Sequence, residues 1–135
     1  MSLFNLIFKK LIPWNQEKDF HLDHATARRD ATFELRYKGK LIGTLRHNNG
    51  KWYFSYSDEY KQKPFVTPLA NFPKIDKDYV FDELPPFFAT RIPALNQPYH
   101  QKKLAKYKAD KNDLVALLEI FGRHSINNPF ELIKT

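Results

Sequence analysis

The stretch that decides the fold is residues 32–57, which read TFELRYKGKLIGTLRHNNGKWYFSYS. Apolar and polar residues alternate along three runs within it, as they do in strands that bury one face. Lys38-Gly39 and Asn48-Asn49-Gly50 separate the runs, and Asn and Gly accept the positive φ that tight hairpins require. The stretch therefore predicts a three-stranded antiparallel meander. One face of the third strand carries Trp52, Phe54 and Tyr56.

The chain beyond this meander predicts shorter elements. Prolines at positions 64, 68 and 73 break residues 58–78 into a long loop with short extended pieces such as residues 65–67. Helices are predicted over residues 87–92, 99–107 and 112–121, and a last strand over residues 130–133. The third helix has Asn112 as its expected cap and Gly122 at its exit. The predicted fold class is α+β, with a small antiparallel sheet (the three-stranded meander plus short strands) packed against about three helices.

Residues 1–31 are predicted to be a separate segment, an apolar helix followed by a polar linker, and residues 32–135 are predicted to form the domain. The first fourteen residues read MSLFNLIFKKLIPW. The lysines follow the apolar part instead of preceding it, which argues against a signal peptide, and the apolar run is too short to span a membrane. Two uses stay open for this helix: docking on this protein or a partner, and binding at a membrane surface.

Composition narrows the class of protein. The chain has 135 residues, of which 42% are hydrophobic and 16% aromatic, so a packed core in one domain is expected. Cysteine is absent, which excludes disulfides, thiolate zinc sites and cysteine nucleophiles and suits a reducing cytoplasm. The formal net charge is +7, which favours an acidic protein surface, nucleic acid or anionic lipid as a partner.

Signatures of catalysis and of cofactor binding are missing from the sequence. The chain has four glycines, and their spacing makes no P-loop, dinucleotide fingerprint or kinase glycine-rich loop. His21 and His24 have a spacing that suits a metal, but no third ligand at a convincing distance completes the site. We therefore predict a protein that is not an enzyme and that holds neither a cofactor nor a metal.

Lysines gather in two stretches of the sequence. Lys61 and Lys63 follow the third strand, and a larger group lies on and after the second helix: Lys102, Lys103, Lys106, Lys108 and Lys111. These residues predict an electropositive patch. No helix-turn-helix, zinc finger or RNP-type motif accompanies them, so direct sequence-specific binding of nucleic acid is not expected.

Four stretches, in order along the chain, resemble motifs of the N-terminal subdomain of HipA-type toxin kinases. Residues 41–45 (LIGTL) resemble the V-G-x-L strand, and residues 52–60 (WYFSYSDEY) resemble the F-x-Y-x-x-x-W/Y-L strand and turn. Residues 87–93 (FFATRIP) resemble F-F-x-N-L-L-P, and residues 113–125 (DLVALLEIFGRHS) resemble D-x-F-x-L-L-x-x-x-G-x-D. The sequence departs from the family pattern at residues 90–95 (TRIPAL, against N-L-L-P-E-G) and at residues 126–129 (INNP), where G-A is customary.

The resemblance implies a function. In that family the subdomain precedes a kinase body and packs on it, whereas this sequence is expected to end at Thr135 with no kinase following. It is therefore similar to the HipS antitoxins of HipBST toxin–antitoxin systems, in which the kinase HipT is the toxin and the helix-turn-helix protein HipB binds the operator. The partners that the resemblance implies are a HipT-like Ser/Thr kinase toxin and, in a ternary complex, a HipB-like DNA-binding protein, in the cytoplasm.

The predicted contact with the kinase is a loop over residues 57–63 that blocks the nucleotide or substrate site. Tyr60 is its expected aromatic anchor, with a covering of the sheet edge as the alternative role. The charged rim of this anchor consists of Asp58, Glu59, Lys61 and Lys63. A second candidate contact consists of Phe87, Phe88 and Ile92, for which packing in the core is the favoured interpretation.

Two other functions stay open at this point. The first is an accessory lobe, or structural subunit, that the kinase needs. The second is a basic nucleic-acid-binding module, which would bind DNA with a steep salt dependence.

Overall fold

The computed structural model describes residues 29–135, so the helix predicted near the N-terminus lies outside the described residues. The predicted meander is confirmed: β1 (Ala31–Tyr37), β2 (Lys40–Asn48) and β3 (Lys51–Tyr56) pair in sequence and antiparallel. Each hairpin turns on two residues with positive φ, Lys38 and Gly39 in the first and Asn49 and Gly50 in the second. Two such residues in succession twist a turn in the sense that suits the strands of a hairpin.

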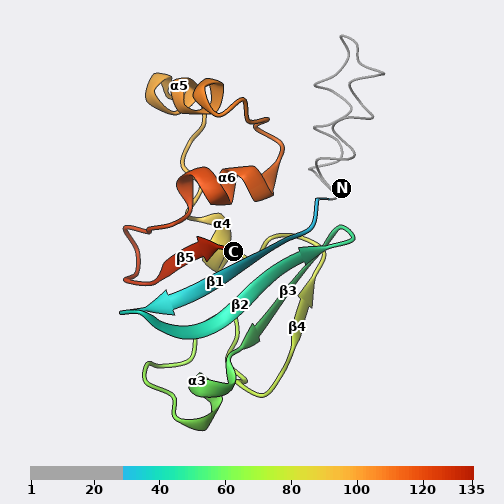
Figure 1. Cartoon of the computed structure of the whole chain (residues 1–135), viewed down its shortest axis with the longest axis vertical. Helices are drawn as coiled ribbons and strands as arrows, with labels where there is room; N and C mark the ends of the chain where they lie inside the picture. Colours follow the sequence, from blue (N-terminus) through green and yellow to red (C-terminus); the bar gives the residue numbers. More distant parts are fainter. Residues whose placement is uncertain (1–28) are drawn as a thin grey trace.

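Two short strands extend the meander to a five-stranded sheet, whose order is β4-β3-β2-β1-β5 (Figure 1). β4 (Tyr79–Phe81) pairs with β3, and β5 (Glu131–Lys134) pairs with β1, both antiparallel. The last strand is thus confirmed, one residue later than predicted. Residues 65–67, predicted as a short extended piece of the long loop, are in no strand, and β3 pairs with residues 79–81.

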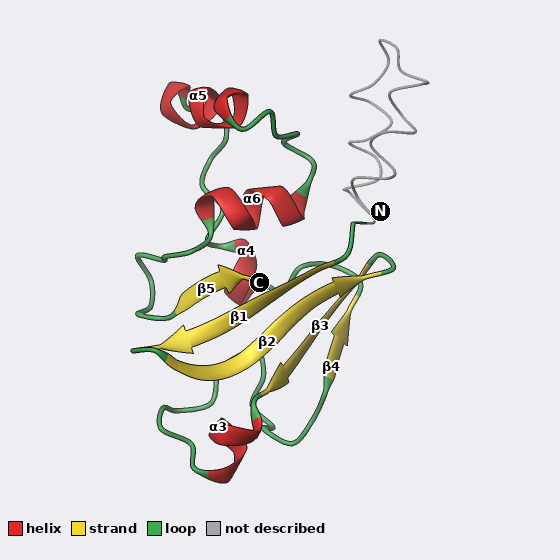
Figure 2. Ribbon diagram, in the orientation of Figure 1, coloured by secondary structure: helices red, strands yellow, loops and turns green. Residues whose placement is uncertain are grey.

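Four helices occur in the described part of the chain: α3 (Asp58–Gln62), α4 (Pro86–Ala89), α5 (Pro98–Lys106) and α6 (Leu114–Phe121). The last three match the predicted helices, whereas α3 occupies the segment predicted as a loop. Asp113, and not Asn112, caps α6, because the Asp113 side chain accepts a hydrogen bond from the Ala116 amide at 3.1 Å. Figure 2 shows α4, α6 and α5 stacked outward from one part of the sheet, with α3 at the other end of the molecule.

The core lies on the inward face of β3. Trp52, Phe54 and Tyr56 are at most 3% exposed, as the alternation predicts. The Tyr56 hydroxyl donates to the Phe72 carbonyl and accepts from the Leu69 amide at 2.9 Å, which fixes the long loop onto the sheet. Burial raises the pKa of Tyr56 to about 12, so the hydroxyl keeps its proton at neutral pH.

Gly43 on β2 lies where the sheet leaves no room for a side chain. A Cβ on this residue would lie 2.6 Å from both the Phe54 ring and the Ser55 carbonyl oxygen. Contacts that short with a backbone atom force the two strands apart. The glycine of the V-G-x-L-like stretch is therefore required by the packing of β2 on β3.

Replacing this glycine should weaken the whole sheet. We expect Gly43→Ala to lower the free energy of unfolding by about 1–3 kcal/mol, measured by urea denaturation. Thr44→Ala, on the opposite face of the same strand, is the matched control and should change it by less than about 1 kcal/mol. Equal stability of the two variants would contradict the steric argument.

Candidate partner-binding surface

The segment predicted to contact a kinase is a short helix held firmly to β2. The Ser57 amide donates to the Ile42 carbonyl at 2.8 Å, and the Ser57 hydroxyl donates to the Leu41 carbonyl at 2.7 Å. The same hydroxyl accepts from the Tyr60 amide at 3.0 Å and so caps α3. Asp58 and Glu59 lie in the first turn, where negative charge stabilises a helix. Residues 57–62 are therefore a rigid projection from the sheet.

The hypothesis that Tyr60 is an exposed aromatic anchor is wrong for this structure. Tyr60 is 0% exposed, and its ring stacks on Tyr56 at 4.9 Å between centroids and meets Phe65 edge-on at 5.4 Å. Its hydroxyl donates to the Val66 carbonyl, and burial raises its pKa. The helical turn after Ser57 brings Tyr60 over the inward face of β3, which explains its burial. Tyr60 is a core residue that fixes α3 and the following loop.

The polar neighbours of Tyr60 remain on the surface. Asp58, Glu59, Gln62 and Lys63 are exposed, and Lys61 is half-buried. We call these five residues the α3 ridge. The ridge carries both signs of charge on a preformed backbone. All of its residues except Gln62 belong to the predicted site, and they are the part of that site that a partner can reach.

The second predicted contact belongs to the core, as its favoured interpretation had it. Phe88 is 0% exposed and lies 5.7 Å from Phe54 between ring centroids. Phe87 and Ile92 are half-buried, and the Phe87 ring packs against Phe88 at 5.1 Å and Phe130 at 6.1 Å. α3 and α4 lie at different ends of the sheet in Figure 1, so the structure does not join the two predicted contacts into one surface.

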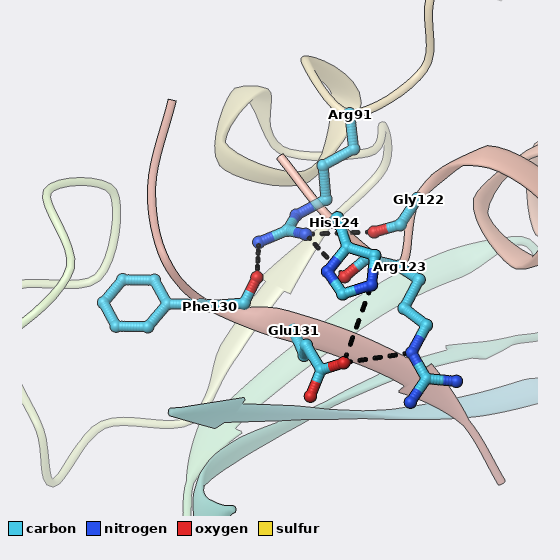
Figure 3. Close-up of polar contacts among 6 residues, drawn as sticks. All are labelled: Arg91, Gly122, Arg123, His124, Phe130 and Glu131. Carbon is cyan, nitrogen blue, oxygen red and sulfur yellow. Dashed lines mark hydrogen bonds and ion pairs between the residues drawn. The ribbon is translucent and has the colours of Figure 1, made fainter. Parts of the chain in front are cut away.

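A buried arginine that sequence reasoning missed organises the other end of the domain. Arg91 is 5% exposed and lies within the apolar run after α4. Its guanidinium donates to the carbonyls of Gly122 at 2.9 Å, Phe130 at 3.1 Å and Arg123 at 3.4 Å (Figure 3). It also donates to the Asn128 side chain at 3.0 Å. One side chain thereby joins the end of α4, the exit of α6 and the start of β5.

No carboxylate of residues 29–135 pairs with this guanidinium. Its Nε atom is buried without a hydrogen-bond partner among those residues, and burial lowers the pKa of Arg91 to about 10. The Arg91 side chain is still charged at neutral pH. The carbonyl oxygens that accept its hydrogen bonds replace the water that would solvate an exposed guanidinium. The signal in the sequence was an arginine inside the cluster FFATRIP, which an amphipathic pattern does not explain.

A cleft of about 520 Å³ lies between α5, α6 and the start of β1. Its lining carries both signs of charge, from Arg29, Lys103, Lys108, Asp110, Asp113 and Glu119. Arg29 forms an ion pair with Asp113 at 2.6 Å. Burial outweighs this partner and raises the pKa of Asp113. The cleft is therefore neither a clear anion site nor a clear cation site.

Residues 29–135 contain neither a cluster of metal ligands nor a membrane-spanning helix. Within residues 29–135, no cluster of three or more His, Asp or Glu side chains is arranged to hold a metal ion. In the same part of the chain, no helix has the length and hydropathy needed to cross a bilayer.

The fold is that of a small α+β domain with an open antiparallel sheet. Residues 33–126 match the family model of the HipA N-terminal domain, so the chain belongs to the HipA N-terminal domain family. A solved structure described as the N-terminal domain of HipA toxin matches with a TM-score of 0.53 and 21% sequence identity, over 78% of this chain and 92% of that chain. Among curated proteins no match is found. The matched region is the N-terminal domain of HipA and not its kinase domain.

The burial of Tyr60 makes its truncation a test of stability. We expect Tyr60→Ala to lower the free energy of unfolding by about 3–5 kcal/mol, because it empties a large space in the core. Tyr60→Phe should cost about 1 kcal/mol, the price of leaving the Val66 carbonyl without its donor. Tyr107→Ala, at an exposed tyrosine, is the control and should stay within about 0.5 kcal/mol of the wild type. A wild-type unfolding curve for Tyr60→Ala would contradict the core assignment.

The role of Arg91 can be measured in the same way. Arg91→Met should lower the free energy of unfolding by about 2–4 kcal/mol, because buried carbonyl oxygens lose their donors. Arg46→Met is the matched control, since Arg46 is exposed on β2 and lies 4.5 Å from the Tyr53 ring centroid. The control should cost less than about 1 kcal/mol. Similar losses in both variants would show that the contacts of Arg91 add nothing to stability.

Proposed function

We propose that this chain is a non-enzymatic antitoxin of a HipBST-type toxin–antitoxin system, which binds and neutralises a HipT-like Ser/Thr kinase toxin. The observation that carries the proposal is membership of the HipA N-terminal domain family over residues 33–126. In the HipA-type toxin kinases that the sequence resembles, this domain packs on the kinase body. A domain with that packing surface is suited to bind a kinase that comes from another chain. The proposed compartment is the cytoplasm, and a HipB-like DNA-binding protein is the proposed third member of the complex.

The α3 ridge is the proposed contact with the kinase. Its backbone is fixed to β2 by the hydrogen bonds of Ser57, so little conformational entropy is lost when it binds. Asp58 and Glu59 precede Lys61 and Lys63, which gives neighbouring patches of opposite charge. Such a pattern favours one complementary partner and one orientation over others. Because Tyr60 is buried, the contact that we propose is polar and depends on shape and charge.

The proposed mechanism is inhibition by occupation. The domain docks on the N-terminal lobe of the kinase, and the α3 projection covers the nucleotide or substrate site. No chemical step by this chain is needed for such inhibition. A kinase that requires the domain as a missing lobe would use the same surface, so the sign of the effect on kinase activity distinguishes the two roles.

The test is co-expression of the full chain with the kinase encoded in its own operon. We expect the two proteins to purify together, the growth arrest caused by the kinase to disappear, and phosphorylation by the purified kinase to fall when the chain is added. The double variant Asp58→Lys/Glu59→Lys should bind the kinase at least about tenfold more weakly, because both negative charges of the ridge are reversed.

Asp76→Lys/Asp78→Lys is the matched control, since it reverses two exposed carboxylates of the loop before β4. It should bind and rescue growth like the wild type. A chain that raises kinase activity is an accessory lobe and not an inhibitor. Failure of the two wild-type proteins to associate would overturn the proposal, and equal binding by both double variants would overturn the α3 ridge as the contact.

A further inference from the structure

α5 contributes almost nothing to the core of the domain. None of its nine residues is buried. Its packing rests on Phe121 of α6, which the His100 ring meets edge-on at 5.4 Å and over which the Lys103 ammonium lies at 5.4 Å from the centroid. In Figure 1 α5 is the outermost helix, beyond α6 and away from the sheet. A helix that is polar nearly all round and held by one edge leaves most of its surface open to a partner.

α5 and the five residues that follow it are strongly cationic. Residues 98–111 contain five lysines and one aspartate, so they supply +4 of the +7 net charge of the chain. Lys102, Lys106, Lys108 and Lys111 are exposed. None of these four lysines pairs with a carboxylate of residues 29–135. The unbalanced charge of the described domain is therefore concentrated here.

Two exposed tyrosines lie among these lysines. Tyr99 is 68% exposed and Tyr107 is 53% exposed, so the domain core leaves both of these large side chains open to a partner. Tyr99, Lys102 and Lys106 are spaced three and four residues apart, which puts them on one side of the helix. Tyr107 follows at the C-terminal end of α5, where it also lines the cleft, and the Lys106 ammonium lies 5.4 Å from its ring centroid. We call the four exposed lysines and the two tyrosines the α5 lysine surface.

Lys108 adds an independent observation. Its φ is +52°, the left-handed conformation that ends many helices and that glycine adopts most easily. The Ala109 amide donates to the Leu104 carbonyl at 2.9 Å across this residue, so the conformation is built into the end of α5. Lysine thus occupies a position where glycine would suit the backbone better. A lysine at this position therefore makes the end of α5 less stable than a glycine would.

We propose that the α5 lysine surface binds the phosphodiester backbone of nucleic acid without reading its bases. Lysine is depleted in protein–protein interfaces and tyrosine is enriched there, and both side chains are common donors to phosphate oxygens. An acidic protein face is therefore the weaker match for a surface with four exposed lysines. Tyr107 and Lys108 also line the neighbouring cleft, which carries Asp110, Asp113 and Glu119, so the phosphate contact extends from Lys102 and Lys106 on α5 to the rim of that cleft. This inference does not depend on the proposed binding of a kinase.

The test measures binding of the full chain alone to a fluorescein-labelled duplex DNA of random sequence by fluorescence anisotropy. With four lysines in contact, log K should fall with log salt at a slope of about −3.6, which is a loss of roughly 100-fold between 50 and 200 mM salt. A single-stranded RNA of the same length is the second probe. Tighter binding of the single strand would show that the tyrosines stack on bases, in addition to the contacts that the lysines make with the phosphate backbone.

Two variants separate binding from folding. Lys102→Gln/Lys106→Gln/Lys108→Gln/Lys111→Gln should bind at least tenfold more weakly at 50 mM salt. Lys40→Gln/Lys74→Gln/Lys77→Gln/Lys134→Gln removes the same charge from exposed lysines outside both proposed surfaces and should retain most of the binding. Lys108→Gly should raise the midpoint of thermal unfolding and still weaken binding by two- to threefold. Absence of salt-dependent binding to either probe would overturn the proposal. Equal loss in the two quadruple variants would overturn it as well, because net charge alone would then explain the binding.

Discussion

The inward side of β3 carries three aromatic side chains, and each fixes a different part of the domain. Trp52 packs on His47 of β2 at 4.4 Å between ring centroids. Phe54 lies 4.4 Å from Phe72 in the long loop and 5.7 Å from Phe88 in α4. Tyr56 stacks on Tyr60 of α3 and bonds to the loop backbone. The positions of α3, of α4 and of the loop between them thus depend on the two-residue period of one strand.

The C-terminal part of the domain depends instead on one buried cation. Arg91 lies at a position where the family motif F-F-x-N-L-L-P has leucine, and Asn128 lies in the second stretch that departs from the family pattern. The two meet in space, because the Arg91 guanidinium donates to the Asn128 side chain at 3.0 Å. A leucine would need neither that amide nor the carbonyls of Gly122 and Phe130. The two departing stretches are therefore in contact in this structure, where Asn128 is one of the acceptors that make the burial of Arg91 possible.

The sequence was most informative where structure is set locally. The alternation of apolar and polar residues defines the meander, together with the turns at Lys38-Gly39 and Asn49-Gly50. The spacing of apolar residues defines α6 to within two residues. The burial of Tyr60 could not be predicted in this way, because it results from a helical turn capped by Ser57 and from the distant loop that supplies Val66 and Phe65. The charged residues around Tyr60 suggested an exposed segment. They are exposed, but the aromatic ring among them points to the sheet.

The burial of Tyr60 also changes what kind of interface the fold can offer. Without an aromatic anchor at α3, binding energy at that end has to come from charge and from a backbone that is already in place, which gives specificity more readily than affinity. The cationic side of α5 lies at the other end of the molecule in Figure 1, with the sheet and α6 between them. The two surfaces do not compete for space. A protein partner on α3 and a polyanion on α5 are therefore compatible with each other on one copy of this domain, and each would be weakened by different substitutions.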